Sequence, residues 1–184
     1  MMDVLRATDR LVFLWLNGWH SPFWDDFFLI ITQIWWSVPL IFYWGFLIFK
    51  KYKFGLWKVL LFAGFLILAT DQGSNIVKNS VKRYRPSHNL EISEIVHTVN
   101  NYKGGQYGFV SGHAANVFAI ATFFFLLLRP SHLLHFLSFL IWASVISYSR
   151  IYLGVHYPAD IICAAILGGG LAILAFQIFK KTQR

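Results

Sequence analysis

The stretch that decides the fold is GFVSGHAANVFAIATFFFLLL, residues 108–128. Its second half, residues 117–128, is apolar except for Thr122, and a block of this composition is apolar enough to lie in a bilayer as part of a helix. Just before it come Ser111, Gly112 and His113, which contribute nothing to solubility in lipid. The sequence therefore predicts a membrane helix that holds something polar at one end.

The composition of the whole chain indicates an integral membrane protein. Of its 184 residues, 57% are hydrophobic and 13% are charged, and the mean hydropathy is +0.55. Soluble domains average about 45–50% apolar and about 25% charged residues. The length suggests one domain, so we expect residues 1–184 to form a single integral membrane domain. The single cysteine, Cys163, cannot form an internal disulfide and carries no redox information.

Five apolar blocks are expected to cross the membrane, which predicts an all-α, polytopic helix bundle. These blocks are Phe27–Phe49, Leu56–Ile76, Val110–Leu128, Leu133–Tyr148 and Ala159–Phe179. Four tryptophans are expected at the membrane interface or facing lipid, namely Trp24, Trp35, Trp36 and Trp44. Three successive glycines at 168–170 are expected to permit close packing of the last helix.

The N-terminal residues 1–25 are expected to form an amphipathic segment ahead of these spans. Within it, Leu11–Trp24 mixes apolar residues with Asn17, His20 and Pro22 and is too short to cross a bilayer. We therefore expect an interfacial helix there. A sixth, tilted span that begins near Asp3 is the alternative.

The charge pattern predicts sidedness and argues against nucleic-acid binding. The net charge is +8, but the clusters KKYK (50–53) and KKTQR (180–184) flank apolar blocks, as cytoplasmic anchors do. Residues 78–107 and 150–157 then lie together on the external face. That face would carry five cations against the positive-inside expectation, namely Lys78, Lys82, Arg83, Arg85 and Lys103. An anionic ligand would explain them.

Three polar clusters meet on that face, each at the outer end of a predicted helix. They are KNSVKRYRP (78–86), VSGH (110–113) and SRIYLGVHYPAD (149–160). Lys78 supplies a compact ammonium charge, and Arg85 and Arg150 each supply a planar guanidinium group. Both kinds of cation suit a phosphoryl group. Ser111 and Gly112, just before a helix, add a hydroxyl, exposed backbone N–H groups and the positive end of the helix dipole.

The histidines of these clusters add chemistry to the predicted anion site. One of His113 and His156 can attack phosphorus while the other protonates the departing oxygen. Asp160 follows His156 by one helical turn and can orient its ring. Each residue also has a structural explanation when taken alone: Ser111 as a helix cap, Asp160 as a first-turn acid, the cations as contacts to lipid head groups. Their gathering on one face favours a phosphate site.

The three clusters resemble the signature blocks of the type 2 phosphatidic acid phosphatase superfamily, which contains membrane lipid phosphatases and soluble vanadium haloperoxidases. The resemblance covers 56–179, the expected catalytic core, and one departure is Val110, where many members have proline. It implies that His156 forms a phosphohistidine, that Asp160 orients it, and that His113 protonates the leaving oxygen and then activates water. The expected phosphate-binding residues are Lys78, Arg85, Ser111, Gly112 and Arg150. The resemblance implies no metal or other cofactor.

The expected substrate is a phosphate or diphosphate of a membrane lipid, because the site lies between apolar helices at the membrane surface. Undecaprenyl diphosphate is the first expectation, and phosphatidylglycerophosphate and lipid A are the alternatives. The small size and short loops resemble bacterial members, which implies a bacterial plasma membrane, and the charge pattern predicts that the site faces the periplasm or the outside. A lipid phosphotransferase would use the same pocket. A transporter would need polar residues through several spans, and a haloperoxidase does not fit the membrane composition.

Two features of the sequence remain open between a structural and a functional explanation. Asp71, two turns before Lys78, either forms a hydrogen bond inside the bundle or belongs to the site. Loop 88–107 frames the entrance and either contacts head groups or is simply solvated; its candidate side chains are His88, Glu91, Glu94 and His97. The oligomeric state is not predicted.

Overall fold

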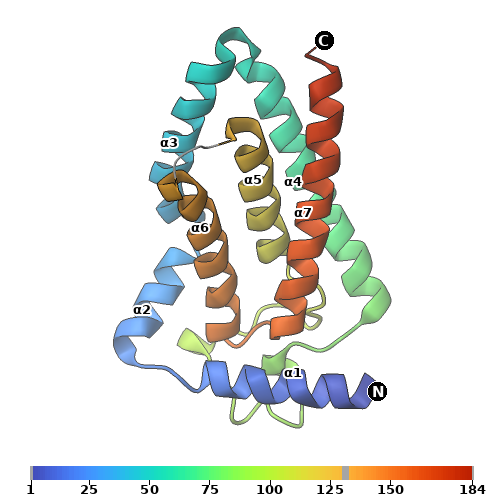
Figure 1. Cartoon of the computed structure of the whole chain (residues 1–184). Helices are drawn as coiled ribbons and strands as arrows, with labels where there is room; N and C mark the ends of the chain where they lie inside the picture. The colour runs from blue at the N-terminus through green and yellow to red at the C-terminus, as the bar shows by residue number, and fades with distance from the viewer. Residues whose placement is uncertain (1, 130–132, 184) are drawn as a thin grey trace.

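The computed structural model describes residues 2–129 and 133–183, which form an all-helical bundle (Figure 1). Its α-helices are α1 (Met2–Asn17), α2 (Pro22–Ile31), α3 (Ile34–Tyr52), α4 (Leu56–Val81), α5 (Gly112–Leu128), α6 (Leu133–Tyr152) and α7 (Pro158–Lys181). Short 3₁₀ helices are η1 (Lys53–Gly55), η2 (Pro86–His88) and η3 (Val99–Asn101). Tyr84 and Tyr107 form an isolated antiparallel bridge. Arg184 of the C-terminal basic cluster lies outside the described residues.

Helix α5 lies at the centre of the bundle, between α3, α4, α6 and α7 (Figure 1). Its first half presents alanines such as Ala115 and Ala119 to α7, and a side chain at Gly168 would overlap the carbonyl of Ala115. Gly168 therefore permits the close packing predicted for the glycine run, while Gly170 has open space beside it. In the second half, Phe123 packs into an aromatic core with residues of α3 and α7. Dense packing of this kind holds helices together in a bilayer, where apolar surface alone gives no preference for protein over lipid.

Four of the five predicted spans correspond to single helices, α4 to α7. Within the described residues, three helical stretches can cross a membrane by length and composition: Trp35–Val81, Leu133–Tyr152 and Pro158–Lys181, with Gly112–Leu128 shorter. The first of these contains α3 and α4, which run in opposite directions on either side of η1 (Figure 1). The chain is thus a polytopic helix bundle, and the number of its spans stays a prediction.

The first predicted span, Phe27–Phe49, is wrong as a continuous helix. Helix α2 ends at Ile31, Gln33 is extended with φ −78° and ψ 138°, and α3 begins at Ile34. The break places the hydroxyl of Thr32 2.9 Å from Nη1 of Arg150, from which it accepts a hydrogen bond. This contact joins residues 118 positions apart in the chain, and hydropathy carries no signal for it. Trp44 also departs from expectation, because it is fully buried and stacks on Phe139.

The predicted interfacial helix Leu11–Trp24 is shifted: the structure has α1 over Met2–Asn17 and a new helix from Pro22. Gly18 follows the last turn of α1, and Pro22 suits the first turn of α2. The helical structure is therefore interrupted between these two residues. Helix α1 begins where the alternative placed a sixth span, but it lies across the end of the bundle (Figure 1). It buries Phe13 and exposes apolar side chains elsewhere, including Trp15.

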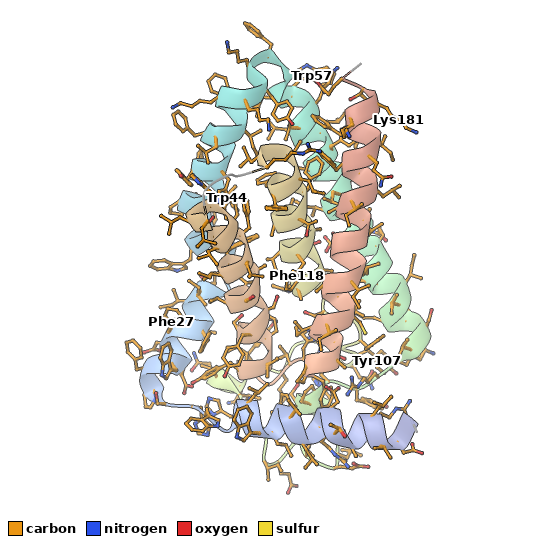
Figure 2. All side chains as sticks on the ribbon, in the orientation of Figure 1. Phe27, Trp44, Trp57, Tyr107, Phe118 and Lys181 are labelled. Carbon is orange, nitrogen blue, oxygen red and sulfur yellow. The ribbon has the colours of Figure 1, made fainter. Side chains whose placement is uncertain are left out.

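The two ends of the bundle differ in charge. Figure 2 shows Trp57 and Lys181 at one end and Tyr107 at the other. At the first end one pocket is lined by Lys51 and Tyr52 together with Lys180 and Gln183, so the two basic clusters lie together as predicted. Helix α1 and the polar loops occupy the opposite end (Figure 1). Which end faces the cytoplasm stays a prediction.

Candidate active site

The three polar clusters of the sequence meet around one cavity at the loop end of the bundle. The cavity has a volume of about 560 Å³. Of the predicted site residues, its walls include Lys78, Arg85, Gly112, His113 and His156. The other three are buried beside it, with exposed fractions of 0% for Ser111, 2% for Arg150 and 0% for Asp160. The structure thus brings all eight predicted residues to the same end of the bundle.

The N-terminus of α5 combines several features that favour binding of an anion. Ser111 caps the helix, since its Oγ accepts a hydrogen bond from the N–H of Ala114 at 3.4 Å, and its own N–H donates to the carbonyl of Asp160. A Cβ at Gly112 would lie 3.4 Å from Nζ of Lys78. The bare backbone therefore lets the ammonium group approach the positive end of the helix dipole, and both favour an anion between them.

His156 lies in the loop between α6 and α7, with Asp160 in the first turn of α7. Nδ1 of His156 lies 3.4 Å from Oδ2 of Asp160, and it has no aligned hydrogen-bond partner among the described residues. The same Oδ2 accepts the N–H of Tyr157 at 2.9 Å. Burial lowers the pKa of His156 to about 4, against the opposing effect of the Asp160 carboxylate. The imidazole is therefore neutral at neutral pH and keeps the lone pair that a nucleophile needs.

Arg83 and Asp9 hold the Asp160 carboxylate from the other side. Nη1 of Arg83 donates to Oδ1 of Asp160 at 2.9 Å, and Nη2 donates to Oδ2 of Asp9 at 2.6 Å. Oδ1 of Asp9 accepts the N–H of Ala159 at 2.9 Å, and the guanidinium lies 3.9 Å from the centre of the Tyr157 ring. Helix α1 is thereby connected through Arg83 to the His–Asp pair.

Sequence reasoning missed the roles of Arg83 and Asp9. Arg83 already stood out as one of the external cations that needed a local reason. Asp9 carried no signal, because its contacts with Arg83 and Ala159 span 74 and 150 residues of sequence. Gly108 was also missed: a Cβ there would lie 3.0 Å from Cγ of Arg85 and 3.5 Å from Nδ1 of His156.

Three cations of the site, Lys78, Arg85 and Arg150, have no acidic counter-ion among the described residues. Nε of Arg85 donates to the carbonyl of Tyr107, and Arg150 donates to the hydroxyls of Thr32 and Tyr102. Among the described residues, neither arginine nor Lys78 lies within 4.0 Å of a carboxylate oxygen. Burial and the neighbouring Arg150 cation lower the pKa of the Arg85 guanidinium. Like charges crowded in this way are stabilised by an anion in the cavity.

Asp71 fits both explanations that the sequence left open. Its Oδ1 accepts a hydrogen bond from Nδ2 of Asn116 at 2.8 Å, which is a contact inside the bundle. Both side chains also line the cavity, on the membrane side of Lys78. In the described chain, no three His, Cys, Asp or Glu side chains lie close enough together to hold a metal ion.

Loop 88–107 is fixed to the N-terminal helices. Nε2 of His97 lies 2.8 Å from Oδ1 of Asp25, and its ring stacks on His20 with centroids 3.9 Å apart. Glu91 forms an ion pair with Arg10 of α1. These contacts show a loop that is packed and paired at two points rather than simply solvated.

Comparison with known proteins identifies relatives over nearly the whole chain. The family model of the PAP2 superfamily, the type 2 phosphatidic acid phosphatases, matches residues 55–184. Lipid A 4'-phosphatase from Bacteroides thetaiotaomicron is 37% identical over 100% of this chain and 83% of its own length. Lipid A 4'-phosphatase from Porphyromonas gingivalis is 37% identical over 97% of this chain and 75% of its own. The crystal structure of Aquifex aeolicus LpxE is similar with a TM-score of 0.68 and 26% identity, covering 90% of this chain and 93% of that chain.

Proposed function

The chain belongs to the PAP2 superfamily and is a membrane lipid phosphatase, and we propose that its substrate is lipid A, from which it removes the 4'-phosphate. The observation that carries the catalytic proposal is the group of cations near His156, namely Lys78, Arg85 and Arg150, which have no carboxylate oxygen within 4.0 Å in the described part of the chain. The choice of lipid is supported by the two lipid A 4'-phosphatases that match at least 97% of the chain. Undecaprenyl diphosphate, the first expectation from sequence, is not supported and gives way to the lipid A alternative.

In the proposed first step, Nε2 of His156 attacks the phosphorus of the lipid. The P–N bond forms as the bond from phosphorus to the sugar oxygen breaks, and His113 gives its proton to that oxygen. Asp160 faces Nδ1 of His156 from 3.4 Å and stabilises the positive charge that develops on the ring. The products are the dephosphorylated lipid and a phosphohistidine.

In the second step, His113 accepts a proton from water as the water oxygen attacks phosphorus. The P–N bond breaks, inorganic phosphate leaves, and His156 returns to its neutral form. Lys78, Arg85 and Arg150 neutralise the charge on the phosphoryl oxygens in both steps, together with N–H groups at the start of α5. A cavity that continues between apolar helices accommodates the acyl chains, and the site faces the periplasm if the basic end is cytoplasmic.

The test is phosphate release by detergent-purified protein in the presence of EDTA. The panel holds lipid A, undecaprenyl diphosphate, phosphatidylglycerophosphate and phosphatidic acid, and mass spectrometry of the lipid A product locates the lost phosphate. We expect lipid A to be preferred, with loss at the 4' position and no release by His156→Ala. Preference for another lipid would reject the substrate proposal. Lipid dephosphorylation without free phosphate would identify a phosphotransferase instead.

A further inference from the structure

One face of α4 lines the catalytic cavity with side chains whose polarity and charge change along the helix. Ile67, Asp71, Asn75 and Lys78 all line it, and their spacing of three or four residues places them on the same side of the helix. Along this face the wall changes from apolar, through acidic and amide groups, to basic. An amphiphile bound with its phosphate at Lys78 would thus meet a polar zone before its chains reach Ile67.

Asp71 has hydrogen-bonding capacity that the protein does not use. Its Oδ1 accepts from Nδ2 of Asn116 at 2.8 Å, and Oδ1 of Asn116 in turn accepts from the hydroxyl of Thr70. In the described part of the chain, Oδ2 of Asp71 has no hydrogen-bond donor and the side chain has no ion pair. A carboxylate within a membrane span is costly unless something compensates it. The cavity is where a compensating group can enter.

The compensating group cannot be the phosphate, because two anions repel each other. A neutral ligand group that enters beside Oδ2 of Asp71 has to donate a hydrogen bond, as a hydroxyl or an amide N–H does. Seven residues of helix separate Asp71 from Lys78, a rise of about 10 Å. That distance leaves room for one sugar ring between the phosphate and the donor.

We propose that Asp71, held by Asn116, is a specificity-determining residue that binds a hydroxyl or amide N–H on the sugar of an acylated amino-sugar phosphate. The inference deepens the proposed function and rests on it for the place of the phosphate. An acylated glucosamine carries such donors next to its phosphate. Phosphatidic acid carries none, and the second phosphate of a prenyl diphosphate would approach the carboxylate with the same sign of charge. Asp71 therefore selects amino-sugar lipids over both.

The test measures binding, so that it does not depend on turnover. Protein with His156→Ala is titrated with lipid A and, separately, with phosphatidic acid, with and without Asp71→Asn. Asparagine keeps the acceptor for Asn116 and removes the charge. Because a hydrogen bond to a charged group contributes about 1.5–3 kcal/mol, we expect the affinity for lipid A to fall roughly 10- to 100-fold. The affinity for phosphatidic acid should change less than about threefold.

Two further variants keep the result interpretable. Asp71→Glu retains the charge and should recover part of the discrimination, and Gln72→Ala, which replaces the neighbouring exposed residue outside the cavity, should alter neither affinity. Size-exclusion elution in detergent confirms that each variant is folded. An equal change on both lipids, or no change on lipid A, would overturn the inference. Failure of this inference is distinct from failure of the proposed function. The latter would appear as no phosphate release by the unmodified protein, which retains His156.

Discussion

The contacts that join Asp9 of α1 to Arg83 and Ala159 predict that Asp9 controls turnover although it lies outside the cavity. Asp9→Ala removes the acceptor for Nη2 of Arg83, at 2.6 Å, and the acceptor for the N–H of Ala159, at 2.9 Å. Arg83 still donates to Oδ1 of Asp160, and Tyr157 still donates to Oδ2. The Asp160 carboxylate therefore keeps these two hydrogen bonds, but it is held less rigidly.

The size of the effect follows from these contacts. The Asp9 and Arg83 side chains are only 10% and 21% exposed, so solvent screens their contact weakly, and one hydrogen bond between charged groups contributes about 1.5–3 kcal/mol. If between half and all of this free energy acts on the orientation of His156, kcat falls roughly 4- to 160-fold. KM should change less than about threefold, because no residue that touches the phosphate has moved.

The assay is phosphate release from lipid A, with kcat and KM measured separately. Asp9→Asn keeps an oxygen acceptor and should retain more activity than Asp9→Ala. Asp3→Ala, on the exposed first turn of the same helix, is the matched control and should behave as the unmodified protein. A kcat for Asp9→Ala within twofold of the unmodified protein, or a loss that appears only in KM, would refute a positioning role for α1.

Three more predictions follow from the geometry. Burial lowers the pKa of His156 to about 4, and only the neutral ring attacks phosphorus. We therefore expect kcat/KM to stay constant as the pH is lowered below 6.5 and to fall only as the pH passes through about 4. A fall in kcat/KM centred near pH 6.5, reversible on return to pH 7, would contradict this. Gly108→Ala should lower kcat about tenfold in folded protein, because its Cβ would press on Cγ of Arg85, whereas Gly105→Ala, with open space, should not. Gly168→Ala should destabilise the bundle by about 1–3 kcal/mol through its overlap with Ala115, and a melting temperature equal to that of Gly170→Ala would show the packing argument to be wrong.

Hydropathy and motif spacing predicted the helices and site residues that depend only on the nearby sequence. The blocks that became α4 to α7 are continuous apolar runs, and the residues around the cavity were found because each cluster sits at a helix end. The break at Thr32 and the burial of Trp44 were missed, since both depend on contacts with distant parts of the chain, Arg150 and Phe139. Periodicity within a window cannot contain such information.

The same limit explains why sequence analysis placed no site residue in the N-terminal third of the chain. The family model begins at residue 55, yet three residues before that point support the site: Asp9 holds Arg83, Thr32 accepts from Arg150, and Asn17 donates to the carbonyls of Ile151 and Tyr152. Asn17 is 2% exposed and also accepts the N–H of His97. These contacts fall on two of the three polar clusters, 78–86 and 149–160, and on the loop 88–107. Residues 1–54 therefore support the phosphate site, and removal of α1 should impair catalysis while the helices of the family core remain.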